Sequence, residues 1–143
     1  MTRMATMGLL LLLLSSLSGD TTAQGNGVIV IGHEKVVQRG TLVTAPNLII
    51  QMTQRTATGM SEVHLKETDT IHVLGGSATF VTGGEMIAST LTAPGQYRGT
   101  GLRGGDEHHL VKDDVIVVPA GVPHWFREVP QSVDYYVVKV VAP

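Results

Sequence analysis

The stretch VIVVPAGVPHWF, residues 115–126, combines a β-branched run, a turn and a histidine. Four consecutive β-branched residues favour a strand, and Pro119 ends that strand because proline has no N–H for a sheet ladder. Gly121 supplies a tight turn, and His124 follows at the start of a second apolar run. The stretch therefore predicts two strands joined by a short turn, with one imidazole held beside that turn.

The chain from residue 24 onward repeats this alternation of short strands and turns. Runs rich in Val, Ile, Thr and Tyr are separated by Gly, Pro, Asn and Asp, and no segment shows a helical period over a dozen residues. Strands are predicted at 28–31, 48–52, 62–65, 71–74, 78–81, 115–118 and 135–141. This pattern predicts an all-β sandwich or barrel, with the Gly-rich segment 92–105 as a long loop between its two halves.

The first residues have the layout of a secretory signal peptide. Arg3 provides the positive start, Gly8 to Leu14 form a continuous apolar run, and small residues follow up to Ala23. The apolar run is shorter than the ~20 residues that a membrane-spanning helix needs. We therefore expect a signal peptide at 1–23 and one domain at 24–143. The protein should be secreted or periplasmic, with no membrane attachment after cleavage.

Composition narrows the classes of partner. The chain has 143 residues, a formal net charge of −2 and no cysteine. It carries no basic run that would favour nucleic acid, and without cysteine neither thiol chemistry nor disulfides are available. Phosphate-binding, dinucleotide-binding and serine-hydrolase motifs are missing from the sequence as well. A small molecule remains the expected substrate or ligand.

Polar residues interrupt the predicted strands in two places. Glu62 and His64 are two residues apart, so they project from the same face of one strand, and Asp69 begins the next strand. Glu67 has the same parity as Asp69 and is an alternative to it. His124 lies beyond the second turn. Imidazoles and carboxylates from facing strands suit a divalent metal of borderline hardness.

These two regions resemble the two conserved motifs of the cupin family. The first motif reads G(X)5HxH(X)3–4E(X)6G, and its later part falls on Glu62, His64, Asp69 and Gly76, with Glu62 in place of a His and Asp69 in place of a Glu. The second reads G(X)5PxG(X)2H(X)3N and falls on Asp113, Pro119, Gly121, His124 and Glu128, with Asp113 in place of a Gly and Glu128 in place of an Asn. The resemblance spans Ser61 to Glu128, and the PxGxxH core is intact.

The resemblance implies a small single-domain, RmlC-like cupin of the cupin_2 type, which is a jelly-roll β-barrel of antiparallel strands. It implies one divalent transition metal in the mouth of the barrel, bound by Glu62, His64, Asp69 and His124. Two nitrogens and two oxygens suit Fe, Mn, Ni or Zn and disfavour Cu(I).

The family analogy predicts a metalloenzyme acting on a small molecule, of oxygenase, isomerase or lyase type. Glu62 would be the general base if it is not a ligand. Two alternatives stay open: a barrel that binds a sugar or another small molecule without turnover, and a structural cupin without metal. A homodimer is expected through an apolar edge strand at 28–31 or 135–141.

Other polar side chains carry weaker indications. His72 has the opposite parity to Asp69 and should face away from the metal. His108 and His109 are expected in a solvated turn. Arg98 and Arg103, in the predicted loop, either hold an anionic substrate or are simply solvated. Phe126 shares the parity of His124, so it either lines the pocket or packs in the core.

Overall fold

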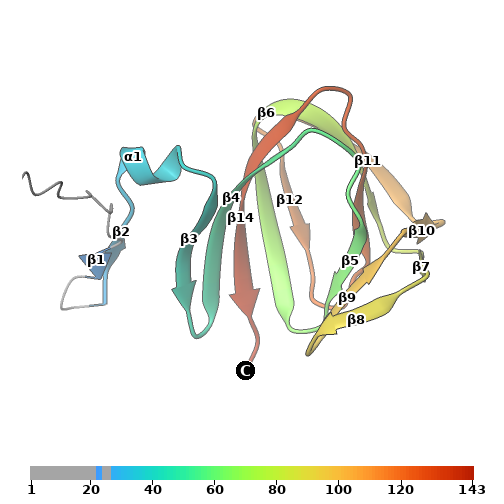
Figure 1. Ribbon diagram of the computed structural model, residues 1–143, viewed down its shortest axis with the longest axis horizontal. Coiled ribbons are helices and arrows are strands. Elements are labelled where there is room, and N and C mark those ends of the chain that lie inside the picture. Colours follow the sequence, from blue (N-terminus) through green and yellow to red (C-terminus); the bar gives the residue numbers. More distant parts are fainter. Residues whose placement is uncertain (1–21, 24–26) are drawn as a thin grey trace, which may run out of the picture.

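A computed structural model describes residues 22–23 and 27–143 of the chain (Figure 1). The predicted signal peptide lies outside the described residues except for Thr22–Ala23. No helix among the described residues is long and apolar enough to cross a membrane. The elements are β1 (Thr22–Ala23), β2 (Ile29–Val30), α1 (His33–Val36), β3 (Gly40–Ala45), β4 (Leu48–Arg55), β5 (Ser61–His64), β6 (Glu67–Thr82), β7 (Glu85–Ile87), β8 (Thr90–Ala93), β9 (Gln96–Gly99), β10 (Gly101–Arg103), β11 (Asp106–Val111), β12 (Val115–Val118), β13 (His124–Glu128) and β14 (Val133–Val141).

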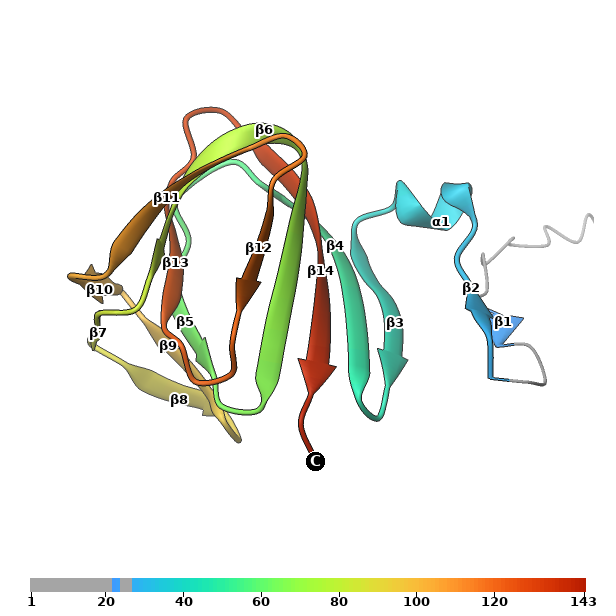
Figure 2. The same cartoon turned by 180° about the vertical axis from the view of Figure 1, so that it is seen from behind.

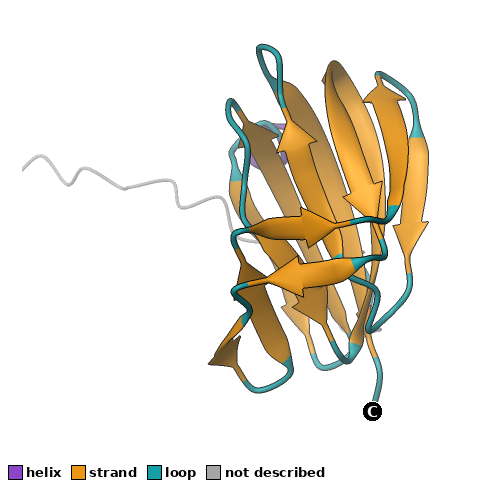
Figure 3. Ribbon diagram, turned by 90° about the vertical axis from the view of Figure 1, so that its right-hand side faces the viewer, coloured by secondary structure: helices purple, strands orange, loops and turns teal. Residues whose placement is uncertain are grey.

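Ten strands form one curled antiparallel sheet in the order β3-β4-β14-β6-β13-β5-β9-β8, with β11 and β12 also paired to β6. Two small sheets, β1-β2 and β7-β10, are separate from it. The long strand β6 joins the two halves of the curl: its first half pairs with β12 and β14, and its second half pairs with β11 and β13. Figure 3 shows the strands wrapped around a common interior. The prediction of an all-β jelly-roll barrel is confirmed, although the predicted strands 71–74 and 78–81 are parts of the single strand β6.

Gly76 explains how one strand serves both halves. Its φ is +74°, which L side chains rarely adopt, and a Cβ at this position would lie 1.9 Å from the Ser132 carbonyl oxygen. The register between β6 and β14 shifts nearby, between Asp134 and Tyr135. The chain therefore bends where only glycine fits, at the position that closes the first sequence motif.

The core fills the interior of the curl. Val73, Phe80 and Val133 are fully buried, and the Phe126 ring packs 4.6 Å from Phe80 and 5.0 Å from Tyr135 between centroids. Burying an aliphatic or aromatic side chain of this kind contributes roughly 1.5–3 kcal/mol. Phe126 belongs to this core and also lines the cavity, so both sequence interpretations apply to it.

The predicted long loop at 92–105 is wrong, because this segment is largely β-structure. Strand β9 pairs with β5 and β8, and β10 pairs with β7. These strands form the side of the barrel remote from α1 (Figure 2). Gly95, with φ +73°, makes the turn between β8 and β9. The segment lacks an apolar period because more than half of its residues are exposed.

The terminal strand is also placed differently from the prediction. Strand β14 lies between β4 and β6, so the proposed dimer edge at 135–141 is wrong. The predicted strand 28–31 is reduced to β2, which pairs with β1, and the short helix α1 follows it. Strand β14 therefore gives no support to the predicted homodimer.

Candidate metal centre

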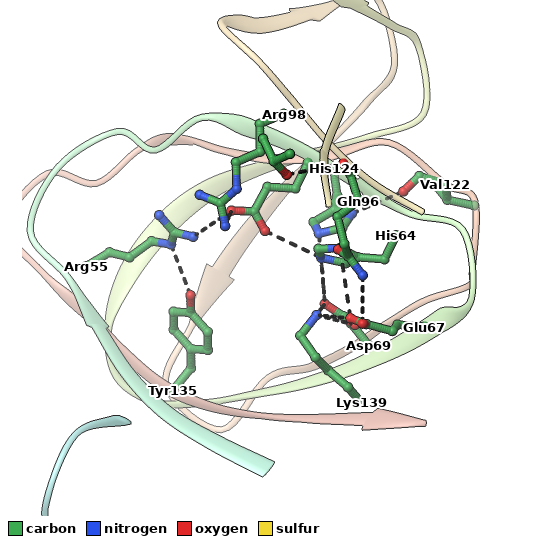
Figure 4. Close-up of polar contacts among 12 residues, drawn as sticks. Arg55, His64, Glu67, Asp69, Gln96, Arg98, Val122, His124, Tyr135 and Lys139 are labelled. Atoms are coloured by element: carbon green, nitrogen blue, oxygen red, sulfur yellow. Dashed lines mark hydrogen bonds and ion pairs between the residues drawn. The ribbon is translucent and has the colours of Figure 1, made fainter. Parts of the chain in front are cut away.

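Two histidines distant in sequence meet because the turn after β12 docks on β5. The Gly121 N–H donates to the His64 carbonyl at 2.8 Å, and Gly121 has φ +81°. Strand β13 then pairs His124 directly opposite Glu62. The two imidazole rings lie 5.1 Å apart between centroids (Figure 4). The structure therefore brings together Glu62, His64 and His124 as the two motifs predicted.

Both imidazoles leave the same ring nitrogen, Nε2, without a hydrogen bond to an acceptor. The Nδ1–H of His64 donates to Gln96 Oε1, and the Nδ1–H of His124 donates to the Val122 carbonyl at 3.1 Å. Such contacts fix the tautomer and leave the Nε2 lone pair free to bind a metal. His64 Nε2 is buried and has no hydrogen-bond partner. A buried lone pair of this kind is the feature that a bound cation would satisfy.

Glu62 faces His64 with one oxygen and two arginines with the other. Oε2 lies 3.4 Å from His64 Nε2, whereas Oε1 lies 3.3 Å from Arg98 and 3.7 Å from Arg55. Burial alone would raise the pKa of Glu62, but the contact with His64 and the charges of Arg98 and Arg55 outweigh it and lower the pKa to about 2. Such a carboxylate is a weak general base at neutral pH. The arrangement favours Glu62 as a metal ligand over Glu62 as the catalytic base, and both roles stay predictions.

The two histidines differ in their affinity for a proton. Burial lowers the pKa of His124, so its ring is neutral at pH 7. Burial also opposes the charged form of His64, but its contact with Glu62 and the nearby Asp69 carboxylate outweigh burial and raise its pKa. A metal at this centre would therefore compete with a proton mainly at His64.

Asp69 and Glu67 share a buried cation that the sequence analysis missed. Lys139 Nζ donates to both oxygens of Asp69 at 2.8 and 2.7 Å and lies 3.1 Å from Glu67 Oε2. Asp69 Oδ2 is 3.6 Å from His64 Nε2 and 3.9 Å from His124 Nε2. Glu67 instead lies near His64 Nδ1, at 3.9 Å. Of the two acidic candidates, Asp69 is the one beside both free imidazole nitrogens, but Lys139 engages both of its oxygens. Its role as a fourth ligand stays a prediction that requires Lys139 to release it.

The donor atoms fit a divalent metal. One ligand atom each from Glu62, His64 and His124 lie within 4.8 Å of one another, and a second such group joins His64 to Glu67 and Asp69. The first group offers two uncommitted imidazole nitrogens and a carboxylate oxygen, a set that suits Zn, Fe, Mn or Ni and leaves further positions open.

A cavity of about 140 Å³ adjoins these residues. A cavity of about 150 Å³ admits a molecule the size of benzene. Its walls combine the centre with apolar and polar neighbours: Gln51, Thr53, Arg55, Met60, Glu62, Asp69, Ile71, Arg98, His124, Trp125, Phe126, Tyr135, Val137 and Lys139. The space matches a small organic molecule in size.

The remaining polar candidates fall into two groups. Arg98 reaches the cavity, whereas Arg103 pairs with Glu85 at the surface. His72 Nδ1 contacts the Tyr136 hydroxyl at 2.9 Å on the opposite face of β6, as its parity predicted. His108, on β11, contacts Thr82 Oγ1 at 2.8 Å. These two histidines take no part in the cavity.

The sequence did carry a signal for Lys139. Along β14 the residues Val133, Tyr135 and Val137 are buried, and Lys139 continues the same alternation. A charged residue at an inward position of a strand requires a partner, which was the clue to the Asp69–Glu67 cluster. Gln96 had no such signal, because its contact with His64 depends on the pairing of β9 with β5.

Comparison with known proteins supports the fold. No protein-family model matches the sequence, and no curated protein matches it significantly. Among solved structures, protein BH2720 of Bacillus halodurans is similar with a TM-score of 0.54 and 16% identity, over 73% of this chain and 70% of that one. A Klebsiella pneumoniae protein with a double-stranded β-helix domain gives 0.51 and 17%, over 73% and 76%. An RmlC-like cupin of Methanocaldococcus jannaschii gives 0.52 and 12%, over 74% and 81%.

The curled antiparallel sheet with histidines at its mouth defines a class of protein. The chain has the double-stranded β-helix fold of the RmlC-like cupins. The cupin_2 subtype stays a prediction.

Proposed function

We propose that this protein binds one divalent transition metal through Glu62, His64 and His124, and that it is a metalloenzyme acting on a small molecule. The observation that carries the proposal is the buried His64 Nε2, which has no hydrogen-bond partner and lies, like His124 Nε2, within 4 Å of Asp69 Oδ2. Both Nδ1 atoms are already committed to acceptors, so both rings are oriented for ligation.

The residues around the centre have definable tasks. A metal here would supply Lewis acidity toward an oxygen of the substrate, as oxygenase, isomerase and lyase reactions require. Arg98 and Arg55 keep Glu62 ionised, so its carboxylate is ready to bind a cation without first losing a proton. Ile71 and Val137 line the cavity with apolar surface that excludes water.

One observation favours the second candidate, a cupin that binds a small molecule without turnover. Within the described cavity, each carboxylate already faces a cation: Glu62 pairs with Arg98, and Asp69 pairs with Lys139. A carboxylate held in this way is a poor proton acceptor. Product formation or oxygen uptake with phenolics, keto acids and sugars separates the two functions. Ligand binding without product in every assay would favour the binding protein.

Elemental analysis tests the metal. The purified protein, loaded with Zn, Mn or Fe(II) and then dialysed, should retain about one equivalent. His64→Ala and His124→Ala should each lower retention at least tenfold, because each removes one of three ligands. His109→Ala, which changes an exposed histidine on β11, is the matched control and should retain the metal. Full retention in both His64→Ala and His124→Ala, or no uptake by the unmodified protein, would overturn the proposal.

We also propose export, on the basis of the signal-peptide layout of residues 1–23. N-terminal sequencing of the protein from the extracellular or periplasmic fraction should start at residue 24. An intact residue 1 in that fraction would contradict cleavage.

We further propose a homodimer, now placed on the outer face of β12. Among the described strands β12 pairs only with β6, so it is an edge strand. Its Val115 and Val117 side chains are 59% and 56% exposed, and an edge strand with apolar side chains favours association. Sedimentation at micromolar concentration should show a dimer that Val115→Lys dissociates. A monomer in the unmodified protein would contradict it.

A further inference from the structure

Two guanidinium groups approach one carboxylate oxygen of Glu62, and the imidazole of His64 approaches the other. Arg98, on β9, and Arg55, on β4, both approach Glu62 Oε1, at 3.3 and 3.7 Å. The other oxygen, Oε2, is the one near His64 Nε2. The carboxylate of Glu62 therefore separates the metal centre from a second, cationic part of the same cavity.

The two arginines have more hydrogen-bonding capacity than Glu62 can use. Each guanidinium carries five N–H donors, and one carboxylate oxygen cannot occupy two such groups. Arg55 is fixed in place: its Nε donates to the Tyr135 hydroxyl at 3.0 Å, and its guanidinium lies 4.9 Å over the centre of the Phe126 ring. Arg98 is 49% exposed at the mouth. Arg55 is thus held in a fixed orientation in the cavity wall, and Arg98 lies at the opening through which a ligand would enter.

Leaving the histidines aside, the charged side chains around the cavity sum to zero before any metal binds. Three cationic side chains face three carboxylates: Arg55, Arg98 and Lys139 against Glu62, Glu67 and Asp69. A divalent ion added to neutral imidazoles leaves two positive charges in a partly enclosed site. Uncompensated charge of that kind is costly, so the loaded cavity favours an anion over a neutral molecule.

The remaining walls limit the body of that anion. Ile71, Val137 and Phe126 contribute apolar surface, and the space of about 140 Å³ holds a group no larger than a benzene ring. Arginine forks match the planar geometry of a carboxylate in particular. Shape, charge and donor geometry all favour one chemical class.

We infer that Arg98 and Arg55 form an anion subsite and that the ligand of this cavity is a small monocarboxylate with a compact apolar body. The inference rests on the proposed function, since the bound metal supplies the excess positive charge. Tyr135 is a positioning residue here, because it acts through Arg55.

Trp125 gives a direct readout, since it is the only tryptophan of the chain and lines the cavity. Zinc-loaded protein is titrated with benzoate and with its neutral counterpart benzamide, and then with propionate and propionamide, by tryptophan fluorescence and calorimetry. Within at least one pair the acid should bind at least tenfold more tightly than the amide. Arg98→Gln should remove that preference, so that acid and amide bind with similar affinity, and the zinc content of the same sample is measured alongside. Arg103→Gln, an exposed arginine paired with Glu85, is the matched control and should keep the preference.

Each outcome bears on a separate claim, because zinc content is measured on the same samples. Zinc-loaded protein that binds acid and amide equally, or binds neither at 10 mM, overturns the subsite and leaves the metal centre standing. Tighter binding of inorganic phosphate than of either acid overturns the assignment to carboxylates. Failure to take up zinc overturns the metal centre, and the comparison of acid with amide on the metal-free protein then decides the subsite alone. An acid preference that survives Arg98→Gln assigns the anion to other residues and overturns the inference.

Discussion

The Lys139 ammonium donates to both carboxylate oxygens of Asp69, at 2.8 and 2.7 Å, deep in the mouth of the barrel. The same ammonium lies 3.1 Å from Glu67. A single internal cation thus compensates two carboxylates where unpaired charge is expensive. Because Asp69 is engaged in this way, a metal at the two imidazoles would find Glu62 as its available carboxylate. Lys139 therefore limits the number of protein ligands.

Lys139→Met should separate the structural role of this lysine from its effect on the metal. Methionine keeps an unbranched stem but leaves Asp69 and Glu67 without their cation, which should destabilise the metal-free protein by roughly 3 kcal/mol at pH 7. Asp69, once released, should raise zinc affinity at least tenfold. Urea unfolding with and without zinc, together with competition against a chelator, measures both effects.

Lys66→Met is the control for that variant, because Lys66 is exposed and the one described hydrogen bond of its side chain goes to the Pro143 carbonyl. It should change neither the free energy of unfolding nor the free energy of zinc binding by more than about 0.5 kcal/mol. If Lys139→Met matched the unmodified protein in stability and zinc affinity, the limiting role of Lys139 would be refuted.

Zinc affinity should rise with pH because His64 must lose its proton to bind. The pKa of His64 is raised in the folded, metal-free protein, so the proton bound to His64 stabilises this metal-free form. The stabilisation is complete below pH 6.5 and is lost as the pH rises through the raised pKa. Metal affinity should therefore be weakest at low pH, climb by about tenfold per pH unit across the titration and level off above it. His124, with a lowered pKa, contributes no proton in this window.

Chelator competition between pH 5.5 and 8.5 gives the profile. Calorimetry in two buffers of different ionisation enthalpy gives the number of protons released, which should be largest at the acid end and fall as the pH rises through the raised pKa of His64. A flat profile with no proton release would contradict the placement of His64 as a ligand.

The sequence predicts those features of the fold and the site that depend on a few neighbouring residues. The strand–turn–His order of residues 115–126 is local, and the turn at Gly121 appears as expected. The parity of Glu62 and His64 is equally local, so both side chains share one face of β5. The meeting of His64 with His124 required the family resemblance, since spacing alone does not determine which strands pair.

What the sequence could not reveal depends on pairing between distant strands. Gln96 reaches His64 only because β9 pairs with β5, and the exposed residues of β8 and β9 show no apolar period. The inward parity of Lys139 is visible in the sequence, but its partner is not, because Asp69 lies opposite it only through the pairing of β14 with β6. Both residues influence the site through tertiary contacts that follow from the folded sheet.

Gly76→Ala should be strongly destabilising. An added Cβ would stand 1.9 Å from the Ser132 carbonyl oxygen, and the position has φ +74°. We expect a loss of 3 kcal/mol or more in the free energy of unfolding, measured in urea. Two control variants separate the steric clash of the added Cβ from the strain of a positive φ. Gly83→Ala has φ +77° but open space and should cost about 1 kcal/mol, whereas Gly75→Ala has open space and no positive φ and should cost little. Equal effects at 75 and 76 would contradict the bend at Gly76.

Asp113→Gly should stabilise the protein, because the sequence departs here from the usual glycine of the second motif. Asp113 has φ +73°, the left-handed region in which glycine is free of strain, while its N–H donates to the Val73 carbonyl at 2.9 Å. The backbone contact survives the substitution, so relief of strain should add about 0.5–1 kcal/mol to the free energy of unfolding. Asp114→Gly is the matched neighbour: the Asp114 carboxylate accepts the Val111 N–H at 2.8 Å, and its loss should cost about 1 kcal/mol. Opposite shifts of the urea midpoint in the two variants would support the motif alignment at Asp113, and a loss of stability in Asp113→Gly would refute the left-handed conformation on which it depends.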